Sequence, residues 1–235
     1  ITSRTLISAD HIIVAANAKE KYKSVSGYTC IFTIRDAHSG LALAVAQKEK
    51  TQDKNYQWLK FFGGVITYRP QVVVKSDAAP EITQAVTDLG WHSEQSLANT
   101  WPHNAVHERW HGSYKSVIRA CMLQSGFRAE FWELAVGYAS VAMAITQPAP
   151  ILPHEQDASG RTLESWKYKE EQTCWQCHHD GNDFTGPIQP FGRLCFYRRP
   201  GSHPLMPTTA AGFFIGWRLE SGCRYRGQLL IHDWE

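Results

Sequence analysis

The chain has 235 residues, of which 43% are hydrophobic and 12% aromatic, and its formal net charge is +2. This composition excludes a disordered or fibrous protein and allows a buried core in one large domain, or in one domain with a small addition. Because it has no run of eighteen apolar residues and its first twenty residues carry several charges, we expect a soluble protein with no membrane span, secretory signal or membrane partner.

The first quarter of the chain predicts three strands and a helix. "TLISADHIIVA" (5–15) and "YTCIFTIR" (28–35) are rich in β-branched residues, and "DAHSG" turns the second strand into "LALAVAQ" (41–47). "TQDKNYQWLKFFGG" (51–64) combines a threonine cap, apolar residues at helical spacing and a double-glycine stop, which together predict a helix.

Strands and helices then alternate. "QVVVKSD" (71–77) predicts a short buried strand, and "PEITQAVTDLGW" (80–91) predicts a helix with a proline near its first turn. "HSEQSLA" (92–98) is interpreted as an extended piece, the fifth strand.

Two helices follow. "WPHNAVHERWHGSYKSVIRACMLQSG" (101–126) is amphipathic from Glu108 onward, and "EFWELAVGYASVAMAIT" (130–146) is apolar nearly all round, so we expect it to pack against the sheet. The order of three strands, then helices alternating with two more strands, predicts an α/β layered domain that covers residues 1–147.

Prolines in "QPAPILPHEQ" break the pattern after residue 147. We interpret residues 148–186 as a polar linker, mainly loop with some helix. Residues 187–235 contain "FGRLCFYRR", "AAGFFIGWRLES" and "YRGQLLIHDWE", which predict short strands and hence a small β-rich C-terminal region.

The six cysteines lack the dense spacing of a disulfide-bonded domain, so we expect reduced thiols in an intracellular protein. "CWQCHH" places Cys174, Cys177 and His178 in the order that attaches c-type haem or supplies three zinc ligands. The motif stands alone and no second ligand pair follows it, which favours a coincidence. In that case Cys174 and His178 should lie in a poorly packed connecting segment without further ligands.

Three acidic residues fall where an α/β sheet gathers its ligands. Asp10 lies within the first strand, Asp77 at the carboxyl end of the fourth, and Glu108 near the start of the helix after the fifth. Carboxylates on three converging elements are what a two-metal phosphoryl-transfer site requires. The plainer alternative is that Asp10 solvates a strand edge and Glu108 forms a surface ion pair with a neighbouring cation.

Two other acids compete for these roles. Asp36 precedes a turn, where an aspartate is expected to accept local backbone hydrogen bonds, whereas an acid inside a strand, such as Asp10, needs a partner or a metal. Glu94 lies in an extended piece, where the alternation of side chains along a strand would point it to one face of the sheet by accident. We therefore choose Asp10 and Glu108.

The helix with Glu108 also carries basic residues and histidines. Arg109, Lys115 and Arg119 are candidates for contact with DNA phosphates, and a solvated basic face is the alternative. Histidines in this segment are expected to be neutral surface residues rather than ligands. They are His103, His107 and His111.

"SDAAPE" followed by "WPHNAVHERWHGSYKSVIRACMLQSGFRAEFWELA" resembles the catalytic core of retroviral and retrotransposon integrases. "SGYTCIFTIRDAHSGLALA" is similar to the hairpin after the first catalytic strand of that family. "IQPFGRLCFYRRP" and "AAGFFIGWRLESG" resemble the segment downstream of the core in copia-type elements. The matching residues are Asn104, Glu108, Arg109, Arg119, Ser125, Gly126, Phe131, Trp132 and Ala135.

The resemblance implies an RNase H-like fold, with a mixed five-stranded sheet flanked by helices. It also implies 3′-end processing and strand transfer of element cDNA into host DNA, with Asp10, Asp77 and Glu108 holding two Mg²⁺ or Mn²⁺ ions. The expected partners are cDNA ends, target DNA and further copies of the chain, in the nucleus or a virus-like particle. The start at Ile1 without methionine fits a piece of a Pol polyprotein.

The chain departs from the family pattern in three ways. The interval between Asp77 and Glu108 is shorter than usual, "DAAPE" replaces the Asp-Asn-Gly-x-x-Glu run, and the His-His-Cys-Cys module that precedes the core is missing from this chain. Two alternatives therefore stay open. One is an inactive or domesticated nucleic-acid-binding remnant, and the other is a hydrolytic RNase H-like nuclease without strand transfer.

Overall fold

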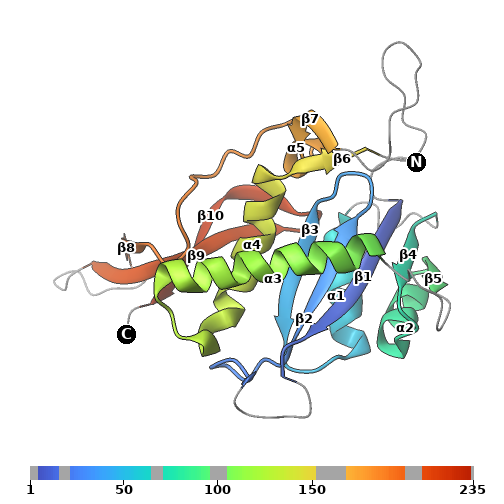
Figure 1. The fold of residues 1–235 in the computed structure, drawn as a ribbon, viewed down its shortest axis with the longest axis horizontal. Helices are drawn as coiled ribbons and strands as arrows, with labels where there is room; N and C mark the ends of the chain where they lie inside the picture. The colour runs from blue at the N-terminus through green and yellow to red at the C-terminus, as the bar shows by residue number, and fades with distance from the viewer. Residues whose placement is uncertain are drawn as a thin grey trace.

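The fold is built on a five-stranded sheet in the order β3-β2-β1-β4-β5 (Figure 1). A computed structural model describes residues 5–15, 22–64, 71–95, 105–151, 168–198 and 208–233. The strands are β1 (Leu6–Ile13), β2 (Cys30–Asp36), β3 (Ala42–Gln47), β4 (Val73–Ser76) and β5 (His92–Gln95). The β1–β2 and β2–β3 pairs are antiparallel, whereas β1–β4 and β4–β5 are parallel. The predicted α/β class and mixed five-stranded sheet are confirmed.

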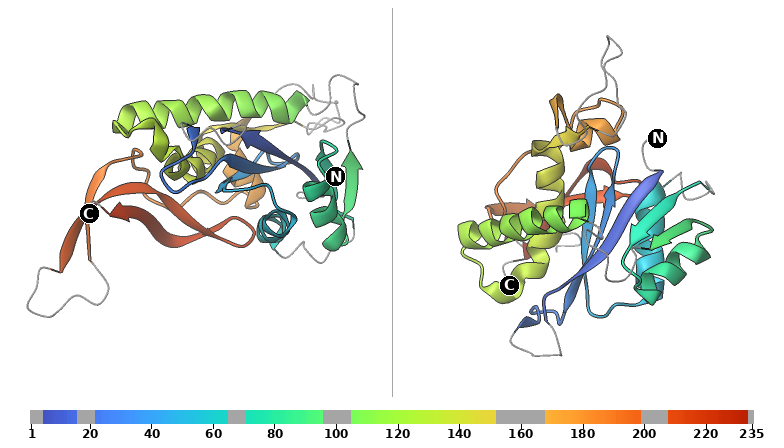
Figure 2. Two further views of the ribbon diagram at one scale, coloured as in Figure 1. Left: turned by 90° about the horizontal axis from the view of Figure 1, so that it is seen from below. Right: turned by 45° about the vertical axis from the view of Figure 1, so that its right-hand side comes forward.

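Helices cover both faces of this sheet. The helices α1 (Gln52–Gly63) and α2 (Pro80–Asp88) lie on one face, and α3 (Ala105–Ser125) lies on the other, as Figure 2 shows. Side chains alternate between the faces of a strand, so β1 and β2 supply both layers. Ile7 and Phe32 pack with α1 and α2, whereas Ile31 packs with α3.

The amphipathic pattern of α3 is realised in its packing. Trp110, Tyr114 and Ile118 recur every four residues and are all buried, which puts them on one face of the helix. The Trp110 and Tyr114 rings stack with centroids 4.7 Å apart, and the Tyr114 hydroxyl donates a hydrogen bond of 2.8 Å to the carbonyl oxygen of Val136. This face fixes α3 against the sheet and against the following helix.

The apolar helix α4 (Trp132–Thr146) follows a short 3₁₀ turn at Ala129–Phe131 and packs on two sides. It contacts β3 on one side and β9 on the other, which explains why its sequence is apolar nearly all round. None of the described helices is long and apolar enough to cross a membrane.

The C-terminal strands are found where the sequence predicts them. They form a second antiparallel sheet in the order β10-β9-β8, and their bounds are β8 (Leu194–Arg198), β9 (Thr209–Glu220) and β10 (Arg224–Asp233). Trp217 stacks on Tyr138 of α4 at 5.2 Å between ring centroids, and the Gly222 N–H donates a hydrogen bond of 2.7 Å to the carbonyl oxygen of Phe61. This sheet is therefore packed on α4 and α1 and shares their core.

The connecting segment also contains regular structure. β6 (Pro148–Pro150) pairs with β7 (Tyr168–Thr173), and α5 (Cys174–His178) follows directly. Thr173 caps α5 through a capping box with Gln176, in which each side chain bonds the backbone N–H of the other residue. Some helix was expected in residues 148–186, and α5 is that helix.

Candidate functional site

The carboxylates of Asp10, Asp77 and Glu108 are carried by three elements that meet on the α3 side of the sheet. Asp10 lies on β1, Asp77 directly follows β4, and Glu108 is in the first turn of α3. β1 and β4 run parallel with Ser8 opposite Lys75, and continuing this register by two residues sets Asp10 opposite Asp77. The Asp10 side chain is half-buried, whereas Asp77 and Glu108 are exposed.

Electrostatics links the three carboxylates. The pKa of Asp10 is raised to about 6, mainly by burial. The negative charges of Asp77 and Glu108 also raise this pKa, whereas the hydrogen bond from the His11 N–H lowers it. That N–H lies 2.6 Å from Asp10 Oδ1. Asp10 is thus within electrostatic reach of both other acids, and a cation placed among them would relieve the repulsion.

The tight cluster expected from the sequence is not seen. Within the described ranges, no group of three or more His, Cys, Asp and Glu side chains is arranged to hold a metal ion. Repulsion between like charges opposes such a close arrangement when no cation lies between them. The donor chemistry nevertheless fits a hard divalent cation, because all three groups are carboxylates.

A buried polar network lies beneath Asp10. His107 places Nδ1 2.8 Å from Ser8 Oγ and Nε2 2.9 Å from Thr33 Oγ1, and the same Thr33 oxygen is 2.8 Å from His111 Nε2. His111 Nδ1 is in turn 3.8 Å from Asp10 Oδ2. The network therefore connects α3, β1 and β2 directly under the carboxylate.

The expectation that the α3 histidines lie on the surface is wrong for two of them. His107 and His111 are one helical turn apart and both face the sheet, where they are buried. Burial lowers the pKa of His107, and burial together with Lys115 lowers the pKa of His111 to about 4, so both rings are neutral at pH 7. His103 and Asn104 lie outside the described residues.

Polar residues at alternating positions of two apolar strands are the sequence pattern that could have predicted this network. Ser8 and Asp10 on β1, and Thr33 and Arg35 on β2, point to the same face of strands that are otherwise apolar. Such a polar row inside a sheet indicates a site or a network of hydrogen bonds. The sequence interpretation used only Asp10 from this row.

Asp36 has a different environment from Asp10. It is fully buried, and it accepts hydrogen bonds from the backbone N–H groups of His38 and Ser39, as expected for a turn aspartate. The Ser39 hydroxyl also donates to it at 2.5 Å, and His178 Nδ1 lies 3.6 Å away. Of the two aspartates, Asp77 is the one whose negative charge is seen to raise the pKa of Asp10.

Glu94, the rival of Glu108, forms an exposed ion pair. Its carboxylate lies 3.2 Å from Lys75 Nζ on the neighbouring strand. Among the basic residues of α3, Arg109, Lys115 and Arg119 are all exposed, and Arg119 bonds Ser116 on its own helix at 2.9 Å. Contact of these three residues with DNA stays a prediction.

The prediction that the segment around "CWQCHH" is poorly packed is wrong. Cys174 and His178 are 4% and 1% exposed, because α5 packs against the turn after β2 and inserts Trp175 into the core. All six cysteines are free thiols, and burial raises the pKa of Cys174 to about 11. The motif thus contributes a buried imidazole to Asp36 and apolar packing to the core.

The Asp36–His178 contact predicts an acid-sensitive fold. Burial alone would raise the pKa of Asp36, but His178 and Ser39 hold it at about 2, below the ordinary 3.8. A carboxyl whose pKa is depressed in the folded state stabilises that state above pH 4 and loses this effect as the pH falls toward 2. Asp36→Asn should therefore lower the free energy of unfolding at pH 7 by about 2 kcal/mol and flatten its decline between pH 4 and 2. Denaturant titrations across this range test this, and an unchanged slope in the variant would contradict it.

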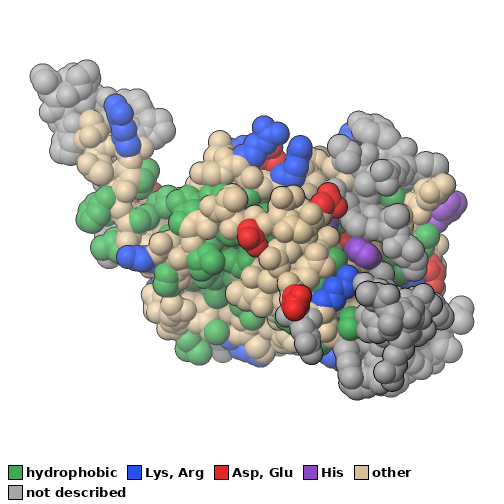
Figure 3. Space-filling model, turned by 90° about the horizontal axis from the view of Figure 1, so that it is seen from above, with side chains coloured by type: hydrophobic (Ala, Val, Ile, Leu, Met, Phe, Trp, Pro, Cys, Tyr) green, Lys and Arg blue, Asp and Glu red, His purple; other side chains and the backbone are tan. Residues whose placement is uncertain are grey.

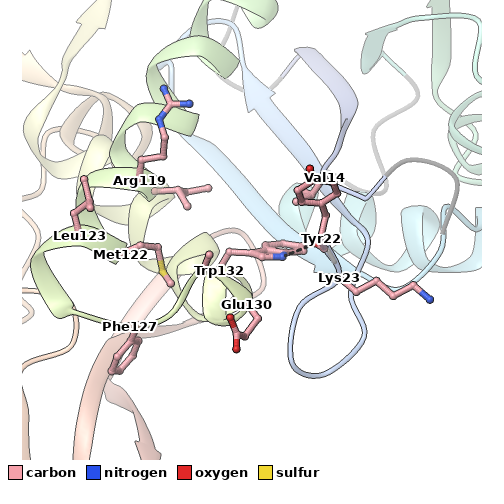
Figure 4. Close-up of a pocket in the computed structure, with 11 residues that line it drawn as sticks. Val14, Tyr22, Lys23, Arg119, Met122, Leu123, Phe127, Glu130 and Trp132 are labelled. Carbon is pink, nitrogen blue, oxygen red and sulfur yellow. Dashed lines mark hydrogen bonds between the residues drawn. The ribbon is translucent and has the colours of Figure 1, made fainter. Parts of the chain in front are cut away.

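An apolar cavity lies far from the carboxylates. It has a volume of about 580 Å³ and apolar walls that include Ile118, Met122, Phe127 and Trp132 (Figure 4). Met122 is fourteen residues beyond Glu108, which is about 21 Å along a helix. In Figure 4 the charged end of Arg119 extends away from the apolar walls.

Comparisons with known proteins give a weak likeness. No protein-family model matches the chain, and no curated protein matches its sequence. The HTLV-2 integrase catalytic core domain in complex with magnesium, in its trimeric form, is 16% identical with a TM-score of 0.46, over 75% of this chain and 97% of that chain. The catalytic core domain of BIV integrase is 17% identical with a TM-score of 0.41, over 68% and 90%. Likeness at this level assigns no family and no activity.

Proposed function

We propose that the chain is the RNase H-like catalytic core of a retroelement integrase, a polynucleotidyl transferase that carries out 3′-end processing and strand transfer. The observation that carries the proposal is the placement of Asp10, Asp77 and Glu108 where β1, β4 and α3 meet, with Asp77 and Glu108 both raising the pKa of Asp10. The resemblance of the α3–α4 segment to integrases, read from its residues, supports the same assignment.

Asp10, Asp77 and Glu108 would hold the divalent cations, two Mg²⁺ or Mn²⁺ ions. Bound cations of this kind supply Lewis-acid stabilisation of charge on phosphoryl oxygens. The chain itself contributes the carboxylates and the buried network that fixes Asp10. The neutral imidazole of His111 beside Asp10 adds no positive charge that would compete with a cation.

DNA would lie along the exposed side of α3 in this proposal. Arg109, Lys115 and Arg119 supply the positive charge there, because they are exposed on the helix that carries Glu108. Figure 3 shows basic and acidic side chains interspersed on the face seen from above, so the chain has no uniformly basic surface in that view. Binding should therefore depend on a few local phosphate contacts and weaken with salt.

The proposal extends to organisation and location. Residues 1–147 would form the catalytic unit, with residues 148–186 connecting it to the C-terminal region 187–235. The chain would act as a homo-oligomer on cDNA ends and target DNA, as a piece of a copia-type Pol polyprotein. Its place of action would be the nucleus or a virus-like particle.

A strand-transfer assay tests this function. A labelled duplex with a recessed 3′-hydroxyl end is incubated with plasmid target in MgCl₂, in MnCl₂ and in EDTA. We expect joined product with either cation and none in EDTA. Binding without any product would favour the inactive remnant, and cleavage without joining would favour the hydrolytic nuclease.

A further inference from the structure

Arg35 is a buried cation that forms no ion pair with a carboxylate of the described residues. Its side chain is on the same face of β2 as Thr33, under α3, and only 8% of the residue is exposed. The guanidinium Nε is buried and has no hydrogen-bond partner, and no described carboxylate lies within ion-pair distance of the group. Asp36, the next residue, belongs to the opposite face and is bonded to Ser39, so its negative charge acts on the guanidinium without an ion pair and has a smaller effect on the Arg35 pKa than burial has.

Such an arrangement is costly for the protein alone. An arginine stays charged at neutral pH even when burial lowers its pKa, as it does here. Placing a charge in a buried site without a partner costs several kcal/mol, so the interior of a folded chain rarely keeps one. An anion that enters the site from outside would offset this cost.

The side chain borders a cavity that can admit such an anion. The cavity has a volume of about 290 Å³ and lies between α3 and the β6–β7 pair. Its described lining includes a second guanidinium, two hydroxyls and an amide, and no carboxylate is among these described residues. The polar lining residues are Arg35, Arg109, Ser113, Gln147 and Tyr168.

The turn after β2 leaves space for the guanidinium. Gly40 has a positive φ of 75°, and a Cβ there would lie 2.9 Å from Cys174 Sγ and 3.3 Å from Arg35 Nη2. A residue other than glycine would thus push against the groups that border Arg35. The glycine keeps the guanidinium in place beside the cavity.

We propose that this cavity, the Arg35 pocket, is a binding site for a phosphate group. Arginine pairs bind phosphate through several charge-assisted hydrogen bonds with planar donor geometry, and the hydroxyl and amide groups add neutral donors. The phosphate is carried on the end of a DNA strand or is free in solution, and only the first source rests on the proposed function. Arg109 lines the pocket and follows Glu108 directly on α3, so the pocket adjoins the helix that carries this carboxylate.

Thermal unfolding in EDTA tests the pocket without any contribution from the carboxylate site. The melting temperature of the full chain is measured in sodium chloride and in sodium phosphate of equal ionic strength. We expect phosphate at ten times its Kd to raise the melting temperature by about 3–6 °C. Arg35→Met should lose this rise and should melt in chloride no lower than the wild type, because it removes an unpaired buried charge.

A matched control and a second variant make the test decisive. Arg128→Met removes an exposed arginine that is ion-paired with Glu130 at 2.6 Å, so the phosphate response should persist. Arg109→Met changes the rim of the pocket, and it should weaken the response even if Arg35→Met fails to fold. A wild type that does not respond to phosphate, or equal responses in wild type and Arg109→Met, would overturn the proposal.

DNA binding separates the two sources of phosphate. The affinities of wild type and Arg35→Met are compared for a short duplex with and without 5′-phosphates. A loss of affinity in the variant that depends on the 5′-phosphate supports phosphate carried on DNA. Unchanged DNA affinity with a lost thermal response supports free phosphate. Neither result depends on strand transfer, so failure of the proposed function leaves the pocket testable.

Discussion

Glu108→Gln is expected to reduce metal-dependent strand transfer by at least ~100-fold. This loss exceeds the one usually seen when a residue that only hydrogen-bonds a metal ligand is changed, because Glu108 would itself be a ligand. The change keeps the size of the side chain but removes the negative charge that acts on Asp10. Glu108 is exposed at the start of α3, so its loss leaves the core packing of Trp110 and Tyr114 intact.

Metal-induced stabilisation provides the measurement that separates catalysis from folding. Mg²⁺ should raise the melting temperature of the wild type above pH 6, where Asp10 is ionised, and should raise it less below that pH. In Glu108→Gln this rise should shrink while the metal-free melting temperature stays the same or increases. Glu94→Gln is the matched control, because Glu94 forms only an exposed pair with Lys75. Retained strand transfer in Glu108→Gln would contradict the catalytic assignment.

Periodicity was enough to predict most of the fold. The strands and helices of residues 5–64 follow local patterns of apolar residues, turn residues and caps, and the structure confirms them within a few residues. The parallel pairing of β1 with β4 then follows from the alternation of strand and helix. The position of Asp10 near Asp77 depends only on this pairing, which explains why it could be expected from the sequence.

Contacts between distant residues could not be predicted in the same way. Asp36 and His178 are 142 positions apart, and no local pattern indicates that α5 returns to the turn after β2. The burial of His107 and His111 depends on which face of α3 meets the sheet, and apolar residues share that face with them. Arg35 was missed because a single arginine in a strand resembles a surface residue until its surroundings are known.

The polar network implies that Asp10 is positioned from α3 as well as from its own strand. Thr33 Oγ1 lies 2.9 Å from the carbonyl oxygen of Asp10, to which it donates, and it also contacts both histidine rings. A hydroxyl has one proton to give, so both rings must act as donors to it through Nε2. Nδ1 of the neutral His111 ring is then unprotonated and, 3.8 Å from the Asp10 carboxylate, makes no hydrogen bond to it, so α3 positions Asp10 through Thr33 and the Asp10 carbonyl oxygen.

His111→Ala should therefore raise the Mg²⁺ concentration needed for half-maximal strand transfer by about 10–100-fold, the usual effect of removing an outer partner of a metal ligand. The maximal rate at saturating Mg²⁺ should change much less, because the three carboxylates remain. His178→Ala is the matched control, since it removes a buried imidazole from Asp36 instead of Asp10. That control should lower the melting temperature but leave the Mg²⁺ requirement unchanged. If His111→Ala lowers only the melting temperature and keeps the wild-type Mg²⁺ requirement, the imidazole packs the core without positioning Asp10.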